Sequence, residues 1–162
     1  MAIESCDPPD RPCILIVDDD ADLVAFLFSV LVDEGFSIVA ASQGQQAMDL
    51  LERGVRPHLI LIDLMLPRIS GFDLLNHIRT DRSLRTIPTI VMTGASERAP
   101  IVADVVFEKP FDHRELLAAI HRLVAPAGSK SAAPMPSRAT ADDHSSGTAR
   151  PSATRRTSRG RR

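Results

Sequence analysis

Carboxylate, hydroxyl and amino side chains follow separate apolar runs of this 162-residue sequence. In chain order they are Asp18 with Asp19, then Asp63, Thr93 and Lys109. Two carboxylates about 4 Å apart repel by roughly 4 kcal/mol at an effective dielectric constant of about 20, so such a pair takes up a proton or binds a cation. Oxygen ligands without His or Cys favour a hard ion, and a small open carboxylate site suits Mg²⁺.

Asp63 is the candidate nucleophile. It stands at the end of the apolar stretch LILID (59–63), and Pro67 and Gly71 shape the loop behind it. A carboxylate beside Mg²⁺, a hydroxyl and a Lys can attack phosphorus, because the two cations neutralise the phosphoryl oxygens. Taken singly, each group also has a structural explanation as a strand end, a helix cap, a turn residue or a solvated charge. Their joint occurrence favours an aspartyl phosphate on Asp63.

The elements that must position these groups alternate along the chain. Short apolar runs predict strands at 13–17, 36–40, 58–62, 87–92 and 104–107. Helical spacing of apolar residues predicts helices over 21–34, over 44–53, over 72–80 and from Asp112 onward, with Asp20 as a helix cap. The segment 96–103 contains Pro100, so only one irregular turn or a loop is expected there.

Five strands alternating with helices predict an α/β fold, a five-stranded parallel sheet between two helical layers. In such a sheet, ligands bind beyond the carboxyl ends of the strands, at the switch in strand order. The polar groups all follow strands, so we expect the fold to gather them at this edge.

Composition divides the chain into an acidic body and a basic tail. Residues 126–162 hold eight Lys and Arg and two acids, a net charge of +6; subtraction from 19 basic and 21 acidic residues leaves −8 for residues 1–125. The tail lacks apolar periodicity and is rich in Pro, Ser, Ala and Arg, which predicts disorder. We therefore expect a flexible arm over 1–12, one folded domain over 13–125 and a disordered tail over 126–162.

The amino-terminal residues and the apolar runs bear on location. Residues 1–12 lack the basic and apolar regions of a secretory signal, and no apolar run reaches the roughly 18 residues of a membrane span. Cys6 and Cys13 have no CxxC or metal-site spacing, and two unpaired thiols suit a reducing compartment. The expected location is the cytoplasm, with no membrane partner.

Four stretches resemble the signature motifs of the response-regulator receiver domain, the phosphoacceptor module of two-component signalling. They are ILIVDD (14–19), LIDLMLPRISG (61–71), IVMTG (90–94) and FEKPF (107–111). Similarity over roughly 12–125 implies a doubly wound, flavodoxin-like fold, here with a shortened fourth helix. It also implies a phosphoacceptor that catalyses only its own phosphorylation and dephosphorylation and is otherwise no enzyme.

The resemblance assigns roles residue by residue. Phosphorylation would occur on Asp63. Mg²⁺ would be held by Asp19 and Asp63, by Asp18 partly through water, and by the backbone carbonyl of Met65. Thr93 would be the switch hydroxyl, and Lys109 would pair with the phosphate. The bond before Pro110 would be cis, a geometry that costs little only before proline.

The chain departs from the family in its expected output region. Val106 stands where the family usually has an aromatic residue whose ring swings inward on activation, and only 15 residues separate Thr93 from Lys109. We hypothesise that partners read an altered output surface. Met65 and Ala95, beside the site, are apolar and cannot orient an attacking water, so slow self-dephosphorylation is expected.

The expected phosphodonor is a sensor histidine kinase or a histidine phosphotransfer protein, and the downstream protein target is unknown. One alternative is a nucleic-acid-associated regulator that grips phosphates through the basic tail; it is the weaker interpretation, because the tail has no aromatic residue for stacking. Another is a phosphorylation-independent adaptor, which would have no need of clustered carboxylates. The histidines show no ligand spacing and are expected at surfaces or interfaces: His58, His77, His113, His121 and His144.

Overall fold

The computed structural model describes residues 11–94 and 101–124. They form one parallel sheet with the strand order β2-β1-β3-β4-β5. The strands are β1 (Cys13–Val17), β2 (Ser37–Ala41), β3 (Leu59–Asp63), β4 (Thr89–Thr93) and β5 (Val105–Glu108). The helices are α1 (Ala21–Asp33), α2 (Gly44–Glu52), α3 (Gly71–Thr80) and α4 (His113–Val124). The predicted doubly wound α/β fold is confirmed.

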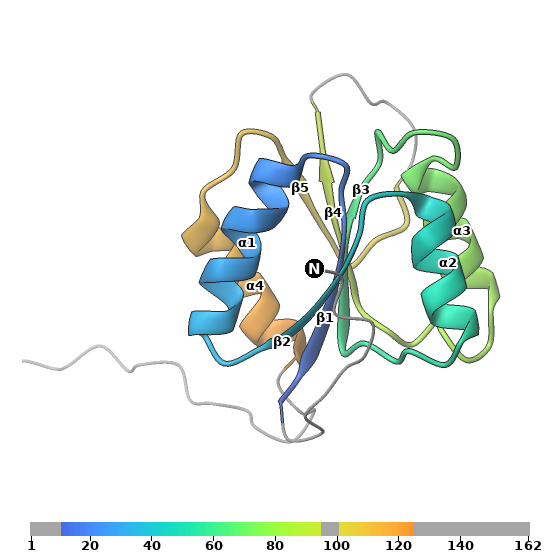
Figure 1. The fold of residues 1–162 in the computed structure, drawn as a ribbon, viewed down its shortest axis with the longest axis horizontal. Helices are drawn as coiled ribbons and strands as arrows, with labels where there is room; N and C mark the ends of the chain where they lie inside the picture. Colours follow the sequence, from blue (N-terminus) through green and yellow to red (C-terminus); the bar gives the residue numbers. More distant parts are fainter. Residues whose placement is uncertain (1–10, 95–100, 125–162) are drawn as a thin grey trace, which may run out of the picture. The chain divides into compact units, whose positions relative to one another are not determined.

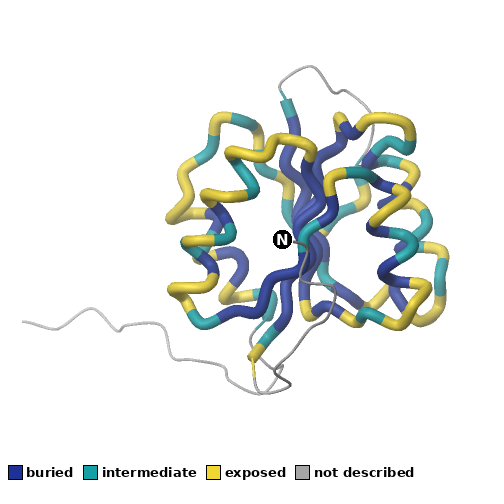
Figure 2. Tube along the Cα trace, in the orientation of Figure 1, coloured by how far each residue is buried: buried dark blue, intermediate teal, exposed yellow. Residues whose placement is uncertain are grey.

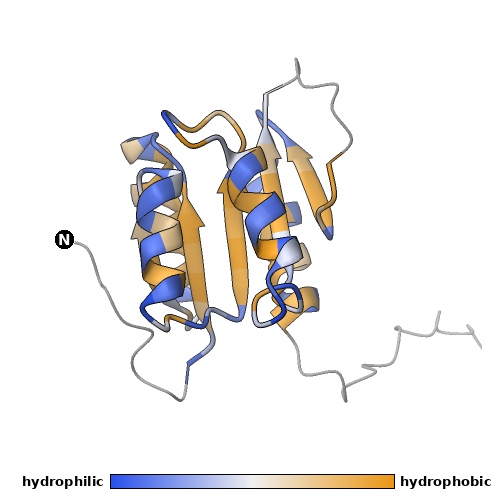
Figure 3. Cartoon of the chain, turned by 90° about the vertical axis from the view of Figure 1, so that its right-hand side faces the viewer, coloured by the Kyte–Doolittle hydropathy of each residue, from blue (hydrophilic) through white to orange (hydrophobic). Residues whose placement is uncertain are grey.

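Two apolar layers enclose the sheet. Helices α1 and α4 cover one face and α2 and α3 the other (Figure 1). Every residue of β1, β3 and β4 is buried, as the dark strands of Figure 2 show. Such strands are apolar on both sides, which is why they read as continuous apolar runs and appear orange in Figure 3.

Local signals in the sequence set the helix ends. Asp20 caps α1 as expected: its Oδ1 accepts hydrogen bonds from the backbone N–H groups of Asp22 and Leu23 at 3.0 and 3.1 Å. Ser70 caps α3 in the same way through the N–H of Asp73. Gly35 follows α1 with a φ of 90°, a left-handed conformation that favours glycine.

Four strands, β2 to β5, begin and end one or two residues later in the chain than the apolar runs suggest. Strand β3 includes Asp63, which pairs with Met92, and β4 includes Thr93, which pairs with Glu108. The predictions ended these strands at the last apolar residue. Backbone pairing continues through the polar residue because the ladder hydrogen bonds involve only main-chain atoms.

The segments outside the described residues include several predicted features. Most of the predicted arm over 1–12 and the whole of the predicted tail over 126–162 belong there, as do Ala95 and Pro100. Of the predicted irregular segment over 96–103, residues 101–103 are described and are not helical.

Two findings bear on the expected location. The expected free thiol at Cys13 is wrong: Cys13 is fully buried at the start of β1 and is disulfide-bonded. Cys6 lies outside the described residues. None of the described helices has the length and apolar character that a membrane crossing requires.

Candidate functional site: an acidic cluster at the carboxyl edge of the sheet

Strand register brings the predicted site residues to one edge. Val17 pairs with Ile62, so Asp18 and Asp63, the next residue of each chain segment, are neighbours across β1 and β3. The order of the strands switches direction between these two strands, where open parallel sheets bind ligands. On the side of β3 away from β1, the Lys109 N–H donates a 2.7 Å hydrogen bond to the carbonyl of Thr93, the last residue of β4. This bond holds Lys109 beside β4.

Lys109 joins the two buried carboxylates. Its Nζ donates to Asp63 Oδ2 at 2.7 Å and to Asp18 Oδ2 at 2.9 Å. The Asp18 side chain is completely buried, the Asp63 side chain is 8% exposed, and the Lys109 side chain is 27% exposed. The ammonium therefore lies between two carboxylates in a largely water-excluded position. The peptide bond between Lys109 and Pro110 is cis.

Asp18, Asp19 and Asp63 form a group suited to a cation. Each offers a carboxylate oxygen, and these oxygens lie within 4.8 Å of one another. Three carboxylates and one ammonium give a formal charge of −2. A hard divalent ion matches both this charge and the oxygen-only donor set, so the residues present fit Mg²⁺.

The protonation tendencies of the cluster follow from burial and pairing. Burial raises the pKa of Asp18, because the charged carboxylate is desolvated; the bond from Lys109 and the Asp20 N–H oppose this shift without cancelling it. Burial by itself lowers the pKa of Lys109, but its hydrogen bonds to Asp63 and Asp18 outweigh that effect and raise it. Lys109 is thus held firmly as a cation.

The remaining bonds orient the carboxylates. Asp18 Oδ1 accepts from the Asp20 N–H at 2.9 Å, and Asp63 Oδ1 accepts from the Met65 N–H at 3.0 Å. Thr93 is 6% exposed, and its hydroxyl donates to the Gly94 carbonyl at 3.1 Å. Asp19 and Met65 are exposed at the rim.

Two glycines fix the loop 64–70 that follows Asp63. A Cβ on Gly71 would collide with the Asp63 carbonyl oxygen, so α3 packs directly on the end of β3. A Cβ on Gly44 would meet the Ile69 carbonyl oxygen at 2.7 Å, which means that α2 approaches the same loop. The sequence pointed to Gly71 but missed Gly44, whose only signal is its place at the start of a helix.

The chain matches the model of the response regulator receiver domain over residues 14–121. It is 37% identical over 116 residues to the DNA-binding response regulator MtrA of Mycolicibacterium paratuberculosis, a match that covers 68% of this chain and 50% of that protein. The chain therefore spans about half the length of the curated relatives it matches.

Solved structures share the fold. The receiver domain of a signal transduction histidine kinase from Syntrophus aciditrophicus is 28% identical with a TM-score of 0.67, covering 79% of this chain and 99% of that one. The receiver domain of a sensor histidine kinase from Pseudomonas aeruginosa, described with a magnesium ion coordinated in its active site cleft, is 24% identical with a TM-score of 0.65; the coverage is 72% and 99%.

The motifs, the parallel five-stranded sheet and the acidic cluster at its switch point agree with these matches. This chain belongs to the response-regulator receiver domain family, the phosphoacceptor domains of two-component signalling.

Proposed function

We propose that Asp63 of this chain accepts a phosphoryl group in a Mg²⁺-dependent reaction. The observation that carries the proposal is the bridge from Lys109 Nζ to Asp63 and Asp18, which sets an ammonium beside the candidate nucleophile. The phosphodonor is a phosphohistidine on a sensor kinase or a phosphotransfer protein. The receiver domain spans approximately residues 13–125. It catalyses only its own phosphorylation and dephosphorylation.

The reaction forms one bond and breaks one. An oxygen of the Asp63 carboxylate bonds to phosphorus while the P–N bond of the phosphohistidine breaks and the donor imidazole leaves. Lys109 then moves its ammonium from the carboxylate to a phosphoryl oxygen, and the Thr93 hydroxyl turns from the Gly94 carbonyl to donate to another. Asp20 remains a helix cap.

Asp18, Asp19, Asp63 and the Met65 carbonyl would hold the magnesium ion. When bound, Mg²⁺ supplies charge neutralisation for the phosphoryl oxygens. The chain's own contribution is positional, since the Met65 N–H fixes one oxygen of Asp63 and Lys109 fixes the other. Met65 is 64% exposed and apolar, which supports slow hydrolysis of the acyl phosphate because its side chain cannot orient a water.

Signalling then proceeds through protein contacts that differ from those of relatives with an aromatic switch. Val106 is 45% exposed on β5, and the described residues that precede this strand, 101–104, are not helical. A β-branched side chain at this position cannot swing a ring between exposed and buried states. Size-exclusion chromatography with and without a phosphoryl mimic tests the proposal; a phosphorylation-dependent dimer through β5 and α4 would contradict it.

The cytoplasm is the proposed location, from the class of partner. Contact with nucleic acid through the basic tail is a second candidate, favoured by the similarity to a DNA-binding relative. Binding that falls steeply with salt and disappears on truncation after Val124 would support it.

The decisive experiment is intact-mass measurement after incubation with acetyl phosphate and Mg²⁺. We expect one phosphoryl adduct that hydroxylamine removes, that requires Mg²⁺, and that Asp63→Asn lacks. An adduct that persists in the folded Asp63→Asn protein would contradict Asp63 as the acceptor. If neither acetyl phosphate nor phosphorylated kinases label the folded wild type, the adaptor interpretation takes its place.

A further inference from the structure

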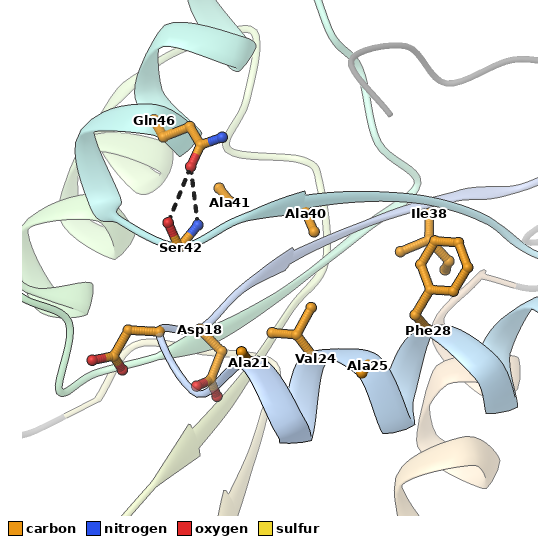
Figure 4. Close-up of a pocket in the computed structure, with 11 residues that line it drawn as sticks. Asp18, Ala21, Val24, Ala25, Phe28, Ile38, Ala40, Ala41, Ser42 and Gln46 are labelled. Atoms are coloured by element: carbon orange, nitrogen blue, oxygen red, sulfur yellow. Dashed lines mark hydrogen bonds between the residues drawn. The ribbon is translucent and has the colours of Figure 1, made fainter. Parts of the chain in front are cut away.

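A cleft with a volume of about 640 Å³ lies between helix α1 and strand β2. Figure 4 shows its two walls: Val24, Ala25 and Phe28 face it from α1, and Ile38 and Ala40 face it from β2. These walls are apolar. Ligand cavities in proteins usually measure about 300–1,000 Å³ and are mostly apolar with a few polar groups. The cleft has the size and the lining of a small-molecule site.

The cleft is open for two reasons that the chain itself supplies. Strand β2 is an edge strand of the sheet, so α1 alone covers this part of its face. Ala25 and Ala40 each contribute a single methyl group, where a leucine on either side would occupy part of the space. Protein interiors are otherwise close-packed, so a hollow of this size reflects missing side-chain volume.

One end of the cleft is polar and acidic. Asp18 and Asp19 line it, and Ser42 and Gln46 stand across from them, joined by hydrogen bonds from the Ser42 N–H and hydroxyl to Gln46 Oε1 at 3.0 and 3.5 Å. The Asp19 carboxylate is exposed and accepts no hydrogen bond from any described residue. Phe28 and Ile38 lie together at the other, apolar end (Figure 4).

We propose that this cleft binds a small organic cation, an amine or guanidine on an apolar body. The body would lie between α1 and β2, and the cationic group would contact Asp19 at the mouth. Charge decides the class: the three clustered carboxylates exceed the single ammonium of Lys109 by two charges, so a neutral head group gains less here and an anionic one is repelled.

Occupancy has a consequence for signalling, which rests on the proposed function. A cation on Asp19 competes with Mg²⁺ for the same carboxylate. The ligand would therefore raise the Mg²⁺ concentration needed for phosphorylation of Asp63. The cleft would make the receiver domain responsive to a small amine as well as to its kinase.

Binding is tested with three probes that share one skeleton: phenethylamine, 2-phenylethanol and 3-phenylpropionate. Each is titrated into the full chain without Mg²⁺, and the backbone amide NMR shifts of α1 and β2 are followed. We expect the amine to bind about tenfold more tightly than the alcohol, and the carboxylate to bind least. Added Mg²⁺ should weaken amine binding in proportion to its own occupancy.

Variants assign the binding to the cleft. Ala40→Leu and Ala25→Leu each fill part of the cleft, from opposite walls, and Asp19→Asn removes the charge at its mouth. Each should weaken amine binding by about tenfold. Two filling variants are used so that the test still holds if one of them fails to fold. Glu52→Gln is the matched control, since Glu52 is an exposed acid of α2 that does not line the cleft, and its removal should leave amine binding unchanged.

Three results would overturn the proposal. They are equal affinity for all three probes, no shift at any soluble concentration, and unchanged amine binding in both filling variants. The experiments distinguish failure of the amine-binding proposal from failure of the phosphoacceptor proposal. If the wild type binds the amine but cannot be phosphorylated, only the proposed function is refuted. Phosphorylation of a wild type that binds no amine refutes only the cleft.

Discussion

Two clusters of charged side chains connect distant parts of this domain, and they are built on opposite principles. At the carboxyl edge of the sheet, Lys109 serves two carboxylates, and Asp19 adds a third. Near the other end of β4, one guanidinium, that of Arg79, serves one carboxylate, that of Asp104, at 2.6 Å. The first cluster carries excess negative charge, and the second is balanced.

The balanced cluster satisfies nearly every donor that it contains. Arg79 donates to five acceptors: the carbonyls of Arg85, Ile87 and Val102, the hydroxyl of Thr89 and the carboxylate of Asp104. Asp104 also accepts from the Thr89 N–H at 2.8 Å. These bonds fasten the non-helical segment 101–104 to α3 and β4. This arrangement is structural, because no charge remains for a ligand.

The pKa values of the two acids, Asp18 and Asp104, shift in opposite directions. Burial raises the pKa of Asp18. Burial also opposes ionisation of Asp104, but the Thr89 N–H and Arg79 outweigh it and lower its pKa. A cluster that holds its acid in a costly charged state gains from a bound cation. A cluster that already stabilises its acid does not.

The largest expected effect comes from removing the shared ammonium. Lys109→Ala should slow phosphorylation of Asp63 about 100-fold, because the developing phosphoryl charge loses a preorganised cation. Mg²⁺ should bind at least as tightly, since the net charge of the site becomes more negative. Stopped-flow phosphorylation and Mg²⁺ titration separate the two effects. Parallel losses of metal affinity and rate would show that Lys109 mainly maintains the fold, and Lys109→Arg serves as the charge-preserving control.

The second-largest expected effect comes from a change in the balanced cluster. Arg79→Ala should lower the free energy of unfolding by about 2 kcal/mol, because five acceptors lose their donor and several are only partly reached by water. Phosphorylation of Asp63 should keep its wild-type rate. Urea unfolding measures the loss, and Arg79→Lys, which keeps the charge but not the planar set of donors, should recover only part of it. A slowed phosphorylation would mean that the two clusters are coupled.

The sequence predicts the first cluster far better than the second. Asp18, Asp63 and Lys109 each follow an apolar run, and parallel strands place such residues at one edge whatever their separation along the chain. Arg79 lies in a helix and Asp104 precedes a strand, 25 residues away. Neither position carries a sequence pattern that predicts their ion pair, since that contact depends on how the non-helical segment 101–104 lies against α3.

The sheet and the cleft differ in the same way in how far the sequence predicts them. Alternation of strands and helices was sufficient to predict the parallel sheet and its layers. The hollow between α1 and β2 depends on two missing side-chain volumes, at Ala25 and Ala40, which face each other only after folding. Periodicity identifies which residues are apolar and not whether opposite walls meet.

The acids should respond to pH in opposite directions. Asp104→Asn should lower the free energy of unfolding near neutral pH by about 1 kcal/mol, a figure already reduced for the 40% exposure of its side chain. Because folding lowers the pKa of Asp104 from 3.8, its contribution is complete above that value and is lost as pH falls through the folded value. The difference between wild type and variant in urea unfolding should therefore shrink in acid.

Asp18→Asn is the matched variant for that experiment. Folding raises the pKa of Asp18 above 3.8, so the folded state binds the proton more tightly and the ionised carboxylate costs stability at higher pH. Without Mg²⁺, Asp18→Asn should raise the free energy of unfolding near neutral pH. Destabilisation by both variants would remove the distinction between the clusters.

The smallest effect concerns the loop that carries the phosphoacceptor edge. Arg68 has a φ of 70°, in the left-handed region that residues with a Cβ rarely adopt. Arg68→Gly removes this strain but increases the entropy of the unfolded chain, so we expect a net gain of about 0.5 kcal/mol in urea unfolding. Gly54→Ala is the converse control: its φ is 97° and an added Cβ would meet nothing within 4 Å, so any loss there is backbone strain alone. A loss of stability in Arg68→Gly would show instead that the arginine side chain stabilises the loop 64–70. The close approaches at Gly44 and Gly71 would then not be the only contacts that fix this loop.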